Sequence, residues 1–175
     1  MKENIMFDTV FDDNSIEYAY LCNGYECSFI IGNEQFFSVD QYMKYQFALI
    51  MEDEKTAKAI LQSKKRKELE HVTIEIDEKL WYKWAVERSS VLLRGTYEKF
   101  KQNLTLRTML FSANGQIAYI SMDKYLGIGM LTTDNRIPSR SGWLGENMLG
   151  YTLMFVKRKL LKEQLDFAEK YKLGK

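Results

Sequence analysis

The 175-residue chain has few of the side chains that carry metal or disulfide chemistry. Its two cysteines, Cys22 and Cys27, are too few for a disulfide scaffold, and its only histidine is His71. Without further Cys or His nearby, the spacing of the cysteines is not that of a zinc site. We therefore expect two reduced, partly buried thiols, no metal and no cofactor.

The chain also lacks a long hydrophobic run. No stretch approaches the ~20 apolar residues that span a bilayer, and the residues that follow Met1 are not those of a signal peptide. These absences predict a cytoplasmic protein with no membrane partner. The formal net charge of +1 argues against bulk attraction to nucleic acid, although it leaves room for a local basic patch.

Proline is scarce as well. The single one, Pro138, lies in the polar, turn-rich segment 132–142, which we interpret as one surface loop and not as a linker between domains. Hydrophobic residues make up 46% of the chain and charged residues 28%, as in an ordinary packed domain. We expect a single domain over residues 1–175.

Hydrophobic periodicity predicts a mainly helical α+β fold with a small antiparallel sheet near the N-terminus. Residues 16–37 are rich in Tyr, Phe and Ile, with turn residues at Asn23–Gly24 and Gly32–Asn33, which is typical of short antiparallel strands. A further strand is predicted over 116–121. Apolar residues at helical spacing predict helices over 38–50, 54–63, 79–102, 103–111 and 143–170.

Three short segments follow one another in the second half of the chain: Lys99–Arg107, Asp123–Gly129 and Trp143–Gly150. Together with Phe37–Met43 upstream, they resemble the NADAR family (the YbiA-like domain), and the resemblance runs from about residue 20 to residue 158. Members of that family are N-glycosidases that act on ribosyl or ADP-ribosyl compounds. The resemblance therefore implies an enzyme that hydrolyses a ribosyl–nitrogen bond.

The resemblance implies two classes of substrate. One is ADP-ribose attached to guanine, either free or in DNA or RNA, and the other is a phosphoribosyl intermediate of riboflavin synthesis. The partner is then an ADP-ribosyl or ribosyl nucleotide. The basic run Lys64–Lys67 would add phosphate contacts if the substrate were a modified nucleic acid, although such a run is usually a solvated helix end.

Two carboxylates are the candidate catalytic acids. Breaking an N-glycosidic bond develops positive charge on the ribose C1 and negative charge on the leaving base, so the site needs a carboxylate near C1 and a donor at the base. Asp40 stands where the family usually has Glu, and it would stabilise the oxocarbenium-like centre or activate the nucleophile. Asp123, before a Gly-Ile-Gly turn, would be the partner acid or base.

The sequence leaves the identity of the nucleophile open. The family places on the same helix a lysine thought to attack the sugar through a Schiff base, and the aligned position here is Phe47. Lys44 lies four residues after Asp40 and three before Phe47, so the three share one helix face and the lysine would reach the same pocket. Lys44 is thus a candidate nucleophile, and an ordinary surface pair of Asp40 with Lys44 is the alternative.

Other residues are predicted to bind the substrate. Glycines would offer backbone N–H groups, a tryptophan would stack on a base or ribose, and asparagine amides would reach a sugar hydroxyl, a phosphate or the leaving base. They are Gly127 and Gly129, Trp84 (with Trp81 as a competitor), Asn23 and Asn147.

Departures from the family pattern keep a second function open. Asp40 replaces Glu, Phe47 replaces Lys, Leu126 replaces Trp, and Ala118 stands where the family strand usually carries Glu. The alternative is a catalytically inactive protein that binds ADP-ribose or a nucleotide on the same fold. Whether the candidate catalytic side chains converge on one pocket separates the two hypotheses.

Overall fold

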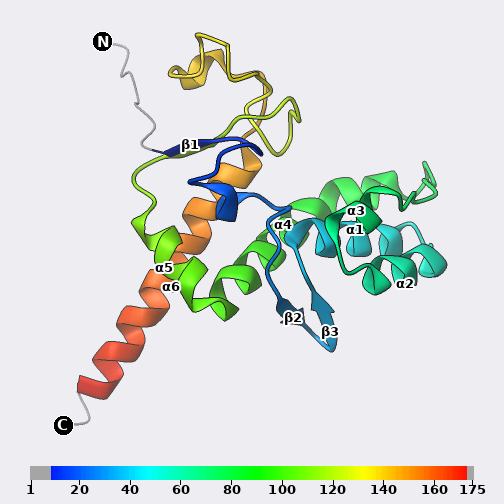
Figure 1. Cartoon of the computed structure of the whole chain (residues 1–175), viewed down its shortest axis with the longest axis horizontal. Coiled ribbons are helices and arrows are strands. Elements are labelled where there is room, and N and C mark those ends of the chain that lie inside the picture. The colour runs from blue at the N-terminus through cyan, green and yellow to red at the C-terminus, as the bar shows by residue number, and fades with distance from the viewer. Residues whose placement is uncertain (1–8, 173–175) are drawn as a thin grey trace. The chain divides into compact units, whose positions relative to one another are not determined.

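A computed structural model describes residues 9–172 of the chain (Figure 1). The chain divides into two compact units. Unit 2 is the continuous segment Asn23–Asn103, and unit 1 combines the residues up to Cys22 with those from Leu104 onward. Each unit is described by itself.

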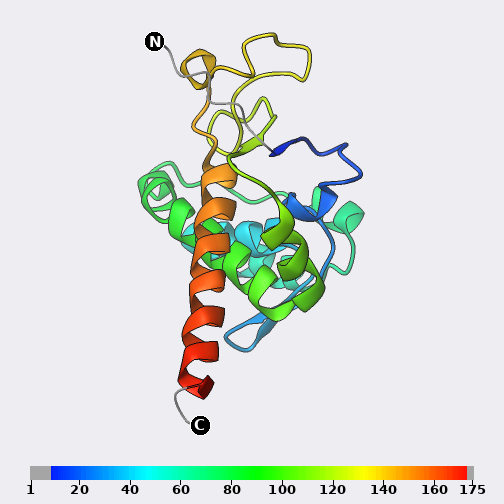
Figure 2. The same cartoon turned by 90° about the vertical axis from the view of Figure 1, so that its left-hand side faces the viewer.

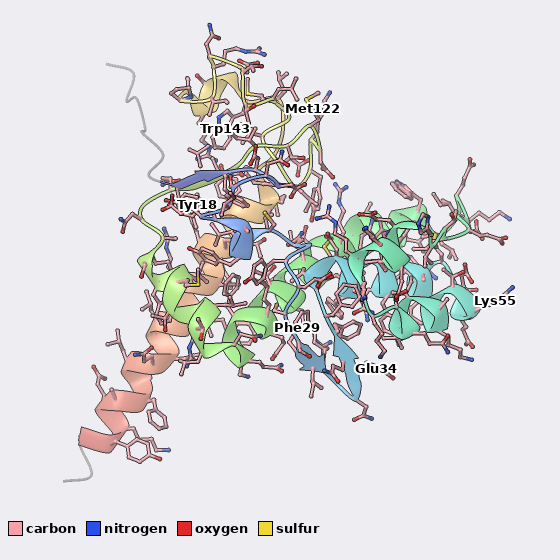
Figure 3. All side chains as sticks on the ribbon, viewed as in Figure 1. Tyr18, Phe29, Glu34, Lys55, Met122 and Trp143 are labelled. Carbon is pink, nitrogen blue, oxygen red and sulfur yellow. The ribbon has the colours of Figure 1, made fainter. Side chains whose placement is uncertain are left out.

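Unit 2 begins with a β-hairpin. Strands β2 (Phe29–Ile31) and β3 (Glu34–Phe36) pair antiparallel, and Phe29 lies opposite Phe36. Gly32 in the connecting turn has φ +65°, a conformation that glycine adopts without strain. Figure 3 labels Phe29 and Glu34 on the two strands. The predicted turn at Gly32–Asn33 is therefore confirmed.

The helices of unit 2 pack around the first of them, α1 (Val39–Ile50), which contacts both α2 (Glu54–Gln62) and α4 (Trp81–Gln102). A short helix, α3 (Arg66–Glu70), follows α2. Apolar side chains of α1, α2 and α3 form one buried cluster: Ala48, Ala57, Ile60 and Leu69.

Local chemistry explains where these helices begin and how closely two of them cross. The Ser38 hydroxyl accepts a hydrogen bond from Gln41 N at 3.1 Å, and Asp53 Oδ1 accepts one from Thr56 N at 3.0 Å, so each caps a helix start. A Cβ atom on Gly95 of α4 would lie only 2.7 Å from Cδ1 of Tyr42. Glycine at position 95 thus permits the close crossing of α1 and α4.

Unit 1 pairs two strands that are distant in the sequence. Strand β1 (Thr9–Phe11) lies parallel to β4 (Ile117–Tyr119), with Val10 opposite Ala118. Between β1 and unit 2 the chain forms a 3₁₀ turn, η1 (Ala19–Leu21). A second such turn, η2 (Arg140–Gly142), lies in the long loop before the last helix.

Two helices complete unit 1: α5 (Leu104–Ser112) and α6 (Met148–Lys172), which contact each other. Figure 2 shows α6 as one long rod with α5 alongside it. One stripe of α6 is buried: Leu149, Leu153, Val156 and Leu160. Within residues 9–172, no helix has the length and apolarity that crossing a bilayer requires.

The predicted helices are confirmed, with one shifted start. The last helix begins at Met148 and not at Trp143, because residues 144–147 form backbone hydrogen bonds to residues 124–128 and cannot wind into a helix. Within 16–37 only β2 and β3 are strands, and the Asn23–Gly24 turn joins no hairpin. Strand β1 and helix α3 were not predicted from the sequence.

Candidate functional site

Asp40 lies in the first turn of α1, against the backbone of residues 23 and 24. Its N–H donates to the carbonyl of Asn23 at 3.1 Å. A Cβ atom on Gly24 would lie 3.0 Å from Oδ2 of Asp40 and 3.2 Å from Nη1 of Arg66. The carboxylate and the guanidinium therefore both border the space that a side chain at position 24 would fill, and glycine leaves that space to them.

Arg66, the first residue of α3, was not predicted as a site residue. Its Nε donates to Oε1 of Glu70 at 3.1 Å, and its backbone N–H donates to Oε1 of Glu26 at 3.3 Å. These contacts hold the guanidinium in place beside Asp40. The signal in the sequence was the basic run Lys64–Lys67, in which Arg66 is the only arginine, but the run alone does not indicate which member lies beside Gly24.

Lys44 also lies against α3. Its Nζ donates to the carbonyl oxygen of Leu69 at 2.9 Å. Asp40 and Lys44, one turn apart on α1, thus have near neighbours on the same short helix, Arg66 and Leu69. Asp40 and Lys44 of the predicted shared face thus lie beside α3, whereas Phe47 packs against Trp81 and Trp84 of α4.

Phe47, at the position where the family has its lysine, belongs to an aromatic cluster. Its ring centroid lies 5.1 Å from that of Trp84, and Trp81 meets it edge-on at 6.0 Å. Trp81 is 47% exposed and Trp84 is half-buried, so the cluster has a solvent-facing side. Trp84 is therefore placed to offer part of an aromatic wall, with Phe47 and Trp81 beside it.

Asn23 is buried and connects the loop to α1. Its backbone carbonyl accepts from Asp40 N, and its Nδ2 lies 3.8 Å from Sδ of Met43, a weak contact.

Tyr42 lies on the buried side of α1. Burial raises the pKa of its phenol, and the nearby Arg94 of α4, by its charge and by a hydrogen bond, opposes that rise. Unit 2 thus brings Asn23, Asp40 and Arg66 to one place, with Lys44 one turn further along α1 against Leu69.

In unit 1, Asp123 caps a tight turn. Its Oδ1 accepts hydrogen bonds from Tyr125 N at 2.8 Å and Leu126 N at 2.9 Å, and its carbonyl accepts from Gly127 N. The residue is exposed. The contacts define a turn-forming role, and the predicted acid or base role stays a prediction.

Gly127 and Gly129 are positioned by the approach of another loop. A Cβ on Gly129, where φ is +71°, would lie 2.9 Å from the backbone N of Gly145, and one on Gly145 would overlap the carbonyl O of Gly127. Leu144 N donates to Ile128 O at 3.0 Å. Both glycines therefore serve loop packing, and the N–H of Gly127 is already bonded within its own turn. Met122 and Trp143, labelled in Figure 3, flank these two loops in sequence.

Asn147 is fully buried and bonds to strand β4 with both ends of its amide. Nδ2 donates to Ile117 O and Oδ1 accepts from Tyr119 N, each at 2.9 Å. Its φ of +53° places it in the left-handed region that asparagine tolerates better than most residues. These contacts support a structural role for Asn147, while the predicted substrate contact stays a prediction.

The described residues contain no group of three or more His, Cys, Asp or Glu side chains placed to hold a metal ion. Within unit 2, the site consists of a carboxylate, a guanidinium and an amine held by α3, with an aromatic cluster on α1 and α4. Chemically, a carboxylate can stabilise a cationic sugar centre, and an aromatic face can hold a base.

The NADAR domain family model matches residues 10–161. The protein irg-1 of Caenorhabditis elegans is 29% identical over 129 residues, covering 71% of this chain and 61% of that protein, so the chain spans about three fifths of that relative's length. The NMR structure of the E. coli protein YbiA is similar with a TM-score of 0.66 and 20% identity, over 92% of this chain and 90% of that chain. This likeness shows a shared α+β fold.

Proposed function

The chain belongs to the NADAR family, whose membership supports an N-glycosidase type of function, and from this premise we propose that it hydrolyses a ribosyl–nitrogen bond. The substrates that we propose are ADP-ribose linked to guanine, free or in DNA or RNA, and phosphoribosyl intermediates of riboflavin synthesis. The observation that supports this proposal is the placement of Asp40 beside Arg66 at the open backbone of Gly24.

In the proposed reaction, Asp40 acts on the sugar. As the bond from ribose C1 to the base nitrogen breaks, the bonding electrons leave with the base and C1 becomes cationic. The carboxylate of Asp40 stabilises that charge or removes a proton from the attacking water. The hydroxyl of water ends on C1, and its proton ends on the leaving nitrogen.

Arg66 and the N-terminal end of α1 both place positive charge on the side of Gly24 where the Asp40 carboxylate lies. An opposite charge within a few ångströms stabilises a carboxylate, and so does the N-terminal end of a helix. Arg66 is thus a positioning residue in this proposal, and Trp84 with Phe47 supplies a surface on which a base or ribose stacks.

Lys44 is not the nucleophile in this proposal. A lysine attacks a sugar carbon only as the neutral amine. The amine of Lys44 instead donates a hydrogen bond to the backbone carbonyl of Leu69, which is a structural role. Hydrolysis by direct attack of water on the sugar needs no lysine at the site.

A second function is favoured by Phe47. This residue stands where the family has its lysine and packs against Trp81 and Trp84, so the position is filled by an aromatic ring. A protein that binds ADP-ribose without cleaving it would need the aromatic surface and not the amine. We therefore keep the inactive binding protein as the alternative.

The test is product release. The purified chain is incubated with a guanine-ADP-ribosylated oligonucleotide, and separately with phosphoribosyl riboflavin intermediates, and products are followed by mass spectrometry. Release of ADP-ribose or ribose phosphate that Asp40→Asn lowers by about 10²–10³-fold supports the hydrolase. If no substrate is cleaved while ADP-ribose raises the melting temperature, the binding protein is correct.

A further inference from the structure

Gln41, the residue after Asp40, places a polar side chain in the interior of unit 2, where only 1% of it is exposed. Its Oε1 accepts a hydrogen bond from Phe37 N at 2.8 Å. Its Nε2 donates to two carbonyl oxygens, that of Ile60 at 2.8 Å and that of Ser63 at 3.1 Å. The amide thus uses both its donors and its oxygen within the fold, as a buried polar group must.

The two donated bonds reach the end of α2. Ile60 lies in the last turn of that helix, and Ser63 is its C-cap. Carbonyl groups at the end of a helix lack the partner that a further turn would supply, and side chains from elsewhere satisfy them. Gln41 does so from the first turn of α1, so the end of α2 is fixed relative to the start of α1.

The segment held in this way leads directly to Arg66. Ser63 and Lys65 are both extended, with ψ of 131° and 152°, and Arg66 follows as the first residue of α3. Three extended residues reach roughly 10 Å, so the place of Arg66 depends closely on where Ser63 is held. The contacts of Arg66 with Glu26 and Glu70 are exposed to solvent, and such contacts constrain a segment less than buried hydrogen bonds do.

We propose that Gln41 is a positioning residue, which keeps Arg66 beside Asp40, and this inference rests on the function proposed above. Asp40 borders the open space at Gly24 from α1, and Arg66 borders it from α3. Gln41 joins the two sides, because its backbone lies in the same turn as Asp40 and its amide holds the chain that leads to Arg66. It acts on the reaction only through the place of the guanidinium.

A double-mutant cycle with Arg66 tests the proposal. Gln41→Met keeps the side-chain length and removes all three hydrogen bonds of the amide. We expect it to lower kcat about tenfold at unchanged KM, because the guanidinium shifts relative to Asp40 while the aromatic surface stays in place. In an Arg66→Ala chain, the same change should lower kcat by less than about twofold, because the group that Gln41 positions is already gone.

The cycle is read on folded protein, with circular dichroism establishing the folded fraction of each variant. Gln41→Asn, which keeps the amide and shortens the side chain by one methylene, supplies the same comparison if Gln41→Met does not fold. Equal losses of kcat in the two backgrounds would show that Gln41 only stabilises the fold, and would overturn the proposal.

Gln102→Met is the matched control. Gln102 also binds backbone with both ends of its amide, since its Oε1 accepts from Ile30 N at 2.9 Å and its Nε2 donates to Ile30 O at 2.7 Å. These bonds join α4 to β2 and hold no part of α3. We expect kcat to stay within about twofold of wild type. A tenfold loss in this variant would mean that any bridging amide affects activity, which contradicts a specific role for Gln41.

Hydrogen exchange measures the placement of α3 without any substrate. Segment 63–70 should exchange at least about tenfold faster in Gln41→Met, whereas segment 91–100 of α4 should stay within about twofold of wild type. Unchanged exchange at 63–70, or an equal rise in both segments, would overturn the link between Gln41 and Arg66. A wild type that cleaves no substrate would instead refute the proposed function, and the exchange rates would still decide whether Gln41 fixes α3.

Discussion

The ammonium group of Lys44 donates a hydrogen bond to the carbonyl oxygen of Leu69, 2.9 Å away. The lysine nearest to the candidate carboxylate in sequence is thereby bound to the end of α3. The contact joins α1 to α3, the helix that carries Arg66. Replacing Lys44 therefore tests whether the lysine acts in catalysis or only holds these two helices together.

We predict that Lys44→Met keeps glycosidase activity within about threefold of wild type, because Lys44 is held by Leu69 and does not attack the sugar. The variant should lose about 1–2 kcal/mol of unfolding free energy with the hydrogen bond. Steady-state rates and urea unfolding measure the two effects. Covalent trapping of wild type with substrate and borohydride at Lys44 would contradict this prediction.

Gly24→Ala should lower activity more than stability. Its new methyl group would lie 3.0 Å from Oδ2 of Asp40 and 3.2 Å from Nη1 of Arg66, so both groups must shift by a few tenths of an ångström. Displacement of a catalytic group on this scale costs about tenfold in kcat/KM.

Gly32→Ala is the matched control for that change. A Cβ on Gly32 meets nothing within 4 Å, but its φ of +65° strains any other residue. This variant should lose about 1 kcal/mol of stability at unchanged kcat/KM. Equal activity losses in the two variants would show that the space at Gly24 has no special role.

Asn147→Ala should destabilise the fold by about 3 kcal/mol or more, measured by urea unfolding. The substitution leaves Ile117 O and Tyr119 N without their buried partner, and alanine also tolerates the positive φ poorly. Asn135→Ala, at an exposed loop position, should change stability by less than about 0.5 kcal/mol. A small effect at Asn147 would indicate that its amide serves a ligand more than the strand.

Tyr119 should make stability fall at alkaline pH. Burial first, and then the nearby carboxylate of Asp13, raise the pKa of this phenol above its usual value of 10.0. Folding therefore favours the neutral phenol, so its contribution is complete below pH 10 and is lost as pH rises from there toward the raised pKa.

Tyr119→Phe should flatten that alkaline loss. Unfolding free energies between about pH 8 and pH 11 should fall less steeply in Tyr119→Phe than in wild type. Parallel slopes for wild type and Tyr119→Phe would rule out this linkage.

Local signals made most of the fold predictable. Ser38 before a run with helical spacing fixed the start of α1, and the Gly32–Asn33 turn between aromatic residues fixed the β2–β3 hairpin. Strand β1 was not predicted, because its pairing partner, β4, is more than a hundred residues away and each strand has only three residues. Helix α3 was not predicted, because it is a short, mostly charged segment with no repeated apolar pattern.

The site was predictable only in part, for a related reason. Spacing along one helix was enough to place Asp40 and Lys44 on the same face. No spacing rule indicates that Arg66, more than twenty residues later, turns its guanidinium toward Gly24. Asn147 was singled out because it matches the family motif. Its hydrogen bonds to β4 could not be predicted, because they depend on a tertiary contact between residues far apart in the sequence.

The pairing of β1 with β4 sets an order of events during synthesis. Unit 2 is one uninterrupted segment, so all of its internal contacts are available once residue 103 has left the ribosome. Strand β1 emerges earlier but must wait for residues 117–119 before it has a partner. We therefore expect unit 2 to fold before unit 1, because contacts between residues close in sequence form faster than contacts between distant ones. A nascent chain stalled shortly after unit 2 should already protect that segment from protease while β1 is still digested.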